Sequence, residues 1–146
     1  MGSELLAYAS LALSALVSAT LLPLGSELVL MGLLQQGYVP LLLWWVATLF
    51  NTLGSVLNWY LGLKLSLFQH KSWFPFSPAQ LQNASTQFQR YGLFSLVFAW
   101  LPVVGDPLTL IAGVLRTRFL WFFLLVATGK GLRYAAVIWF FPLEMT

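Results

Sequence analysis

Four charged residues of this chain lie inside otherwise apolar segments: Glu27, Asp106, Lys130 and Arg133. An ionised side chain is costly at membrane depth, so such charges normally face one another or a wet cavity. Two are acidic and two are basic, so a shared site would be neutral overall. We therefore predict a central polar site for an ion, a proton or a lipid headgroup. The alternative is a pair of purely structural ion pairs that hold helices together.

Two asparagines in an apolar segment extend this set. Asn51 and Asn58 offer neutral hydrogen-bonding groups, which serve either the same polar site or contacts between helices. We include Asn51 with the four charges in the candidate transport and substrate-binding site.

The remaining residues argue against enzyme chemistry. The chain has no cysteine, and its one histidine, His70, lies in a polar stretch. There is no phosphate-binding glycine loop and no nucleophile elbow. Two carboxylates without a third acid nearby are too few for a divalent-metal site. We expect no enzyme activity, no metal and no cofactor.

The composition places these charges in a membrane. Hydrophobic residues make up 60% of the 146 residues and charged residues 8%, against roughly 45–50% and 25% in soluble domains. A soluble globule and a disordered chain are both excluded. The net charge of +3 comes from seven basic residues that form no stripe. It therefore indicates membrane orientation, and we expect no nucleic-acid partner.

Two uninterrupted apolar segments are clearly long enough to cross a bilayer core of roughly 30 Å. These are Leu41–Leu63 and Phe119–Phe141, and both carry tryptophans near their ends, as interface belts do. We expect both to be spanning helices. A third helix is predicted over residues 78–90, where Ser77 can cap and Pro78 can start it. Its apolar residues recur at helical spacing, so we expect an amphipathic helix at the membrane surface.

The other apolar segments form two pairs, each joined by a Pro/Gly turn that carries one acid. A nine-residue helix rises about 13 Å, roughly half of the hydrocarbon core. We expect each pair to be a re-entrant hairpin, although Leu5–Leu22 is long enough to lie partly along the interface or to cross fully. The pairs are Leu5–Leu22 with Leu28–Leu34, and Leu93–Leu101 with Leu108–Leu115; the turn residues are Pro23, Gly25, Pro102, Gly105 and Pro107.

The two halves of the chain resemble each other at an offset of 79 residues. This offset places Pro23 on Pro102, Glu27 on Asp106 and Asn51 on Lys130. Each half crosses once, so the second half must be inverted, which is a transporter architecture. The predicted fold is an all-α membrane protein with two re-entrant helical hairpins and two spanning helices in an inverted repeat. It is one domain, 1–146, with a first repeat over about 5–63, a connector over 64–91 and a second repeat over about 92–141.

Basic residues predict the orientation. With two re-entrant hairpins, the connector and the turn before the last helix share one side, which holds all five basic loop residues and no acid. The other side holds Glu4 and Glu144 and no basic residue. Basic loops face the cytoplasm, so we expect a multi-pass protein with both termini outside.

Three short strings resemble the DedA (VTT-domain, SNARE-associated) membrane protein family, in its short YqaA-like branch. They are Ser18-Ala19-Thr20-Leu21-Leu22-Pro23, Leu101-Pro102-Val103-Val104-Gly105-Asp106 and Gly129-Lys130-x-Leu132-Arg133-Tyr134. The resemblance implies two facing re-entrant hairpins in the bacterial inner membrane. It also implies lipid traffic, because family members recycle undecaprenyl phosphate or scramble phospholipids, some of them with the proton gradient. Glu27 matches the acid of the first hairpin and Pro102 the proline of the second.

The chain departs from the longer family members at two positions. They carry an arginine three residues before and three residues after the second hairpin's proline, where this chain has Ala99 and Gly105. A grip on a lipid phosphate would therefore fall to Lys130 and Arg133.

These features predict a lipid flippase or scramblase-like transporter for lipid phosphates or phospholipid headgroups, with proton coupling as an option. The partners are membrane lipids, and the sequence is compatible with an oligomer. Two other functions stay open. One is a proton- or cation-coupled small-solute transporter, and the other is a non-transporting structural or assembly protein.

Overall fold

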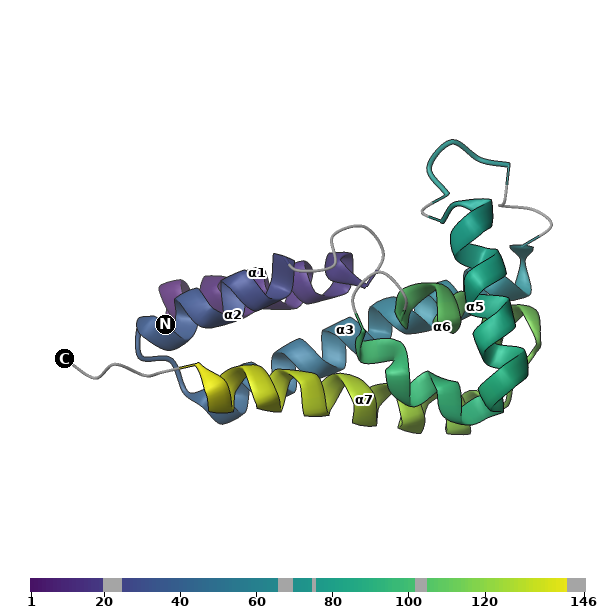
Figure 1. Ribbon diagram of the computed structural model, residues 1–146. Coiled ribbons are helices and arrows are strands. Elements are labelled where there is room, and N and C mark those ends of the chain that lie inside the picture. The colour runs from purple at the N-terminus through teal and green to yellow at the C-terminus, as the bar shows by residue number, and fades with distance from the viewer. Residues whose placement is uncertain (20–24, 66–69, 75, 102–104, 142–146) are drawn as a thin grey trace.

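The computed structural model describes residues 1–19, 25–65, 70–74, 76–101 and 105–141, and those residues are helical with no strand (Figure 1). Pro23 and Pro102, two of the predicted turn residues, lie outside this part. The elements are α1 (Gly2–Ser18), α2 (Gly25–Gln35), α3 (Pro40–Leu63), α5 (Pro78–Tyr91), the 3₁₀ helix η1 (Gly92–Trp100), α6 (Gly105–Val114) and α7 (Phe119–Phe140).

The two predicted spanning helices are confirmed within one residue at each end. By length and composition, α3 with 24 residues and α7 with 22 residues are the two described helices that can cross a membrane. They rise roughly 36 Å and 33 Å. In Figure 1 they run antiparallel along the length of the molecule. The start of α1 and the end of α7 lie at the same end.

The shorter elements pair up around these two helices. In the first pair, α1 packs on α3, and α2 contacts both α3 and α7. In the second pair, η1 packs on α7 and α6 packs on α3. Figure 1 shows the two pairs reaching inward from opposite ends, so that their inner ends lie near the middle of the molecule.

The same helix cap occurs once in each half of the chain. At the end of α2, the N–H of Gly37 donates to the carbonyl of Leu34, and the N–H of Tyr38 donates to that of Leu33. This is a Schellman cap. The two bonds recur 79 residues later at the end of α6, from Arg116 to Gly113 and from Thr117 to Ala112. Both caps lead into a spanning helix through one extended residue, Val39 and Arg118 respectively.

Glycines bring α3 and α6 into backbone contact. A Cβ on Gly62 would collide with the carbonyl oxygen of Leu110, and a Cβ on Gly113 would collide with that of Trp59. A similar contact joins α1 to α3, where a Cβ on Gly54 would lie 2.7 Å from the carbonyl oxygen of Leu16. Small residues at such crossings let helices pack closely without a hydrophobic driving force.

The short arms differ from the predicted half-helices in three respects. α1 is one uninterrupted helix of 17 residues, which rises roughly 26 Å. The arm after Gly92 is a 3₁₀ helix, so its nine residues extend to about 18 Å instead of 13 Å. Gly25, Gly105 and Pro107 lie in the first turns of α2 and α6 and not in the connecting turns. Proline is tolerated there because the first-turn N–H groups have no partner within the helix.

The amphipathic helix is confirmed as α5. Ser77 and Gln80 form a reciprocal capping box at its start. Its buried residues Ala84 and Phe88 belong to a core cluster with residues of α6 and η1. The apolar face therefore packs on α6 and η1, and the position at a membrane surface stays a prediction. Amphipathicity identifies the face to be buried, but not the partner that buries it.

Candidate functional site

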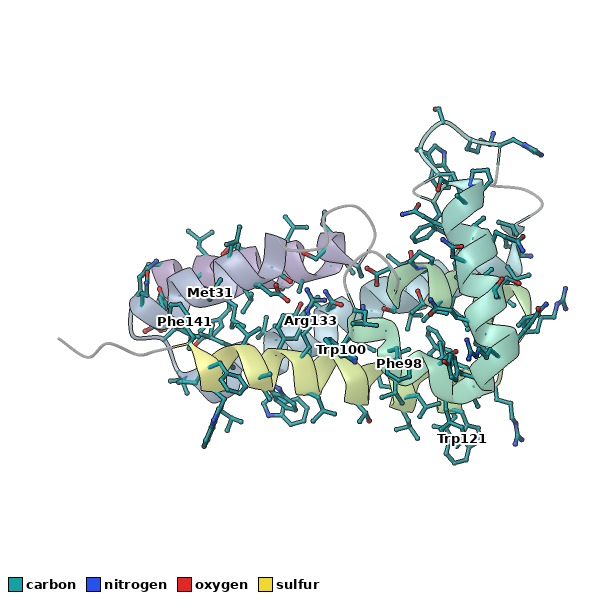
Figure 2. The ribbon with its side chains drawn as sticks, in the orientation of Figure 1. Met31, Phe98, Trp100, Trp121, Arg133 and Phe141 are labelled. Atoms are coloured by element: carbon teal, nitrogen blue, oxygen red, sulfur yellow. The ribbon has the colours of Figure 1, made fainter. Side chains whose placement is uncertain are left out.

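Arg133 joins the inner ends of the two short helix pairs. From the middle of α7, its Nε donates to the carboxylate of Glu27, with which it forms an ion pair. Its Nη1 donates to the backbone carbonyl of Trp100 at 3.0 Å. Glu27 lies in the first turn of α2, and Trp100 ends η1. Figure 2 shows Arg133 beside Trp100, between the two pairs.

Lys130 makes a second ion pair one helical turn away. Its Nζ lies 3.3 Å from Oδ1 of Asp106, in the first turn of α6. It also donates to the side-chain oxygen of Asn51 and, at 3.3 Å, to the backbone carbonyl of the same residue. An ammonium group has three donors, so all three have partners. This matters because Lys130 is only 1% exposed.

The two ion pairs form one electrostatic unit. The positive charge of Arg133 interacts electrostatically with Asp106 and with Lys130, so each ion pair influences the other. The side chains of Glu27, Asp106 and Arg133 retain 14–18% of their exposure, whereas that of Lys130 retains 1%. Three of the four charges are therefore within reach of a small group from outside. Both acids also lie at helix N-termini, where the helix dipole favours negative charge.

The sequence analysis missed three residues of this region. The hydroxyls of Ser26 and Tyr134 are 2.7 Å apart, directly beside the Glu27–Arg133 pair in sequence and in space. The third is Trp100, which contributes only its backbone carbonyl. Adjacency to a charged residue was the sequence signal for Ser26 and Tyr134, and Tyr134 also ends one of the three strings that carry the family resemblance; Trp100 had no signal.

The asparagines serve as contacts between helices, and Asn51 serves the charge site as well. The amide nitrogen of Asn51 donates to the carbonyl of Ala15 at 2.9 Å, while its oxygen accepts from Lys130. Asn58 donates to the carbonyl of Ala19 at 2.9 Å and to the hydroxyl of Thr109 at 3.2 Å. Asn51 therefore fixes α1 on α3 and holds the ammonium of Lys130 at the same time.

The positions at which longer family members carry arginines are closed here. Ala99 is buried, and a Cβ on Gly105 would collide with the carbonyl oxygen of Ala99. With this backbone neither position has room for a long side chain. Both basic groups of the site come from α7 instead.

A cavity of about 270 Å³ lies between α1 and the start of α2. It is lined by Ser10, Leu13, Ser14, Val17, Ser18 and Gly25. All of its lining residues except Gly25 belong to α1, and its exposed wall is mainly apolar.

Fold and site together define a helical membrane protein with a buried charge site shared by two short helix pairs. The chain is 39% identical over 136 residues to the inner membrane protein YqaA of Escherichia coli (strain K12), which covers 92% of this chain and 91% of that protein. The YqaA of Shigella flexneri matches equally. An uncharacterized protein of Haemophilus influenzae is 36% identical over 86% of this chain and 82% of its own length.

The chain therefore belongs to the YqaA-like branch of the DedA family, among bacterial inner-membrane proteins. The sequence resemblance is confirmed. No family model matches the chain, and no solved structure matches it.

Proposed function

We propose that this protein moves lipid headgroups across the bacterial inner membrane, in the manner of a flippase or scramblase. The observation that carries the proposal is the bridge made by Arg133, which holds the first turn of α2 and the end of η1 on one guanidinium. A basic group at the meeting point of two hairpins is the place where an anionic headgroup can be held halfway across.

The proposal assumes that α1–α2 and η1–α6 are re-entrant hairpins of an inverted repeat. Three observations support this architecture: the identical caps 79 residues apart, the packing of α1 on α3 and of η1 on α7, and the antiparallel course of α3 and α7. Inverted repeats with broken helices bind their substrates near the bilayer midplane. The charge site lies at the corresponding place.

Binding would exchange one anion for another. The guanidinium of Arg133 is held by the carboxylate of Glu27, and a lipid phosphate offers the same forked acceptor geometry.

Proton coupling follows from the same exchange. A proton taken up by the carboxylate of Glu27 would remove its charge and free Arg133 to hold the phosphate. Loss of the phosphate would favour ionised Glu27 and the resting ion pair. Asp106 and Lys130 can act in the same way, except that the deeper burial of Lys130 makes that pair harder to open.

A second candidate function rests on the direct pairing of all four charges. Two closed ion pairs are also what a non-transporting structural or assembly protein would need to fix its helices. A small-solute transporter would use the same two acids without a lipid substrate.

We further propose that the basic end of the molecule faces the cytoplasm and that the start of α1 and the end of α7 lie outside. All five basic residues outside the central site belong to the connector or to the ends of α3, α5, α6 and α7 at that end. Membrane lipids are the partners, and the protein acts without a metal or cofactor as a single membrane domain.

The test is headgroup-labelled lipid translocation in proteoliposomes, with and without a pH gradient. We expect translocation above that of protein-free liposomes, with a rate that depends on the gradient if a proton is coupled. Translocation equal to that of protein-free liposomes would contradict lipid transport and favour the structural or assembly role. Uptake of a labelled small solute without lipid translocation would favour the solute transporter.

A further inference from the structure

A second cluster of positive charge lies at the end of the molecule where α3 and α6 finish and α7 begins. Lys64 caps the C-terminus of α3, and Arg116 and Arg118 lie in the turn between α6 and α7; all three side chains are exposed. The helix ends that carry them touch, since a Cβ on Gly62 would lie 2.8 Å from the backbone nitrogen of Val114. Three cations from three helix ends therefore lie close to one backbone crossing at this end of the molecule.

Arg116 occupies a backbone conformation that favours glycine. Its φ is +54°, and it is the one non-glycine residue with positive φ in the part of the chain that the structure describes. The equivalent cap of α2, with the same two hydrogen bonds, has Gly37 at this position with φ +86°. An L-residue is disfavoured there by its Cβ. Because the fold makes the same turn with glycine elsewhere, the strained arginine points to a use for its charge.

Arg118 can likewise be compared with the equivalent residue of the first half, Val39, and its backbone is not strained. It is the N-cap of α7 with φ −63° and ψ 125°, and the N-cap of α3 is Val39 with φ −64° and ψ 116°. Neither side chain makes a capping hydrogen bond. A valine serves this backbone equally well, so the charge of Arg118 is not needed to start the helix.

The cluster has no internal counter-charge among the described residues. The ion pairs in that part of the chain are the two of the central site, and neither includes Lys64, Arg116 or Arg118. Like charges brought together repel one another unless an anion lies between them. An anion from outside the chain would relieve this repulsion.

The turn that carries the two arginines is fixed in place. Thr117, which separates them, accepts a hydrogen bond from the indole nitrogen of Trp59 at 3.3 Å and donates to the carbonyl of Ala112 at 3.1 Å. The ring of Trp59 also packs on that of Phe119 at 5.4 Å. The arginines thus project from a held backbone, which lowers the entropic cost of binding.

We propose that Lys64, Arg116 and Arg118 bind the phosphate of an anionic membrane lipid at the surface of the bilayer. The cluster lies at the ends of both spanning helices, at the level where headgroups are found, and an indole at that level is typical of the membrane interface. Guanidinium groups pair with phosphate oxygens in forked geometry. The site is separate from the central charges and does not depend on the transport activity proposed above.

The test gives the turn after α6 the residues that stand at the equivalent positions after α2. The variant is Arg116→Gly with Arg118→Val. In neutral detergent, we would measure the rise of the thermal unfolding midpoint with added phosphatidylglycerol, and with phosphatidylcholine as the uncharged reference. Phosphatidylglycerol should raise the unfolding midpoint of the parent protein, and phosphatidylcholine should not. The double variant should need roughly thirtyfold more of it for the half-maximal rise, at about fivefold for each arginine.

Two controls keep the result specific. Lys71→Gln and Arg90→Gln each remove an exposed charge from another part of the chain and should leave the phosphatidylglycerol response unchanged. Arg116→Gly alone relieves the positive φ, so it should unfold at or above the parent midpoint without lipid and still lose about fivefold in lipid response. An unchanged response in the double variant, or an equal loss in the controls, would overturn the proposal. Equal stabilisation by soluble glycerol phosphate would assign the site to free phosphate and not to a membrane lipid.

Discussion

Asn51 and Lys130 are 79 residues apart, the same offset that separates the two helix caps, and they are in direct contact through the ammonium of Lys130. Residues related by a two-fold axis can touch only where they lie close to that axis. The pair therefore marks the axis of the proposed inverted repeat. Because one half contributes an amide and the other an ammonium, the axis carries a single positive charge.

Both basic residues of the charge site come from α7. Glu27 and Asp106 are themselves equivalent, and each begins the second arm of its pair. Lys130 and Arg133 lie three residues apart on α7 and reach one acid each. The position equivalent to Arg133 in α3 is Gly54, which packs on α1. The charge site is thus central in place but asymmetric in composition.

Removal of the buried cation should be strongly destabilising. In Lys130→Met, the partly buried carboxylate of Asp106 loses its partner, and we expect the free energy of unfolding to fall by roughly 3–5 kcal/mol. Chemical denaturation in detergent measures this. The double variant Lys130→Met with Asp106→Asn removes both charges and should regain most of the loss. A double variant no more stable than the single one would contradict the assigned pairing.

The backbone contact between α3 and α6 should be sensitive to one methyl group. In Gly113→Ala, the new Cβ collides with the carbonyl of Trp59, and we expect a loss of roughly 1–3 kcal/mol from overpacking. Gly32→Ala is the matched control, since Gly32 lies in α2 with nothing within 4 Å of its Cβ position. It should stabilise the protein by roughly 0.5–1 kcal/mol. Thermal unfolding of the two variants in the same detergent compares them, and equal midpoints would argue against the close crossing.

Single cysteines test whether the first hairpin is re-entrant, because the chain contains none of its own. Ser3, at the start of α1, and Gln36, just after α2, are both exposed. Cysteines at these two positions should react with a membrane-impermeant maleimide from outside the cell. A cysteine at Ser72, in the connector, should react only after the membrane is opened. Labelling of Ser3→Cys and Gln36→Cys from opposite sides would show that one arm crosses fully.

The long elements could be predicted from the sequence because hydrophobic length alone defines them. α3 and α7 end where their apolar runs end, and Ser77 with Pro78 marks the start of α5. The 3₁₀ geometry of η1 has no such signal, because a short and mostly apolar run suits either helix type. Its glycine at residue 92, with φ +65°, allows the sharp break from α5.

The site could be predicted as a set of residues but not as a set of pairs. The cost of charge in an apolar segment selects Glu27, Asp106, Lys130 and Arg133, since each needs a partner. Which acid meets which base depends on where the first turns of α2 and α6 lie relative to α7, which residue types do not determine. The hydrogen bond from Arg133 to a backbone carbonyl could not be predicted from side-chain types, because every residue has a carbonyl.

The central claim is that the two acids act in transport and do not only hold the helices together. Glu27→Gln and Asp106→Asn keep the size and most hydrogen bonds of each side chain while removing its charge. The measurement is headgroup-labelled lipid translocation by proteoliposomes of each variant, at matched protein content and with normal insertion verified. The account predicts a loss of at least tenfold in both, larger for the more accessible Glu27–Arg133 pair. Translocation at the parent rate in both variants would contradict it and make the acids structural.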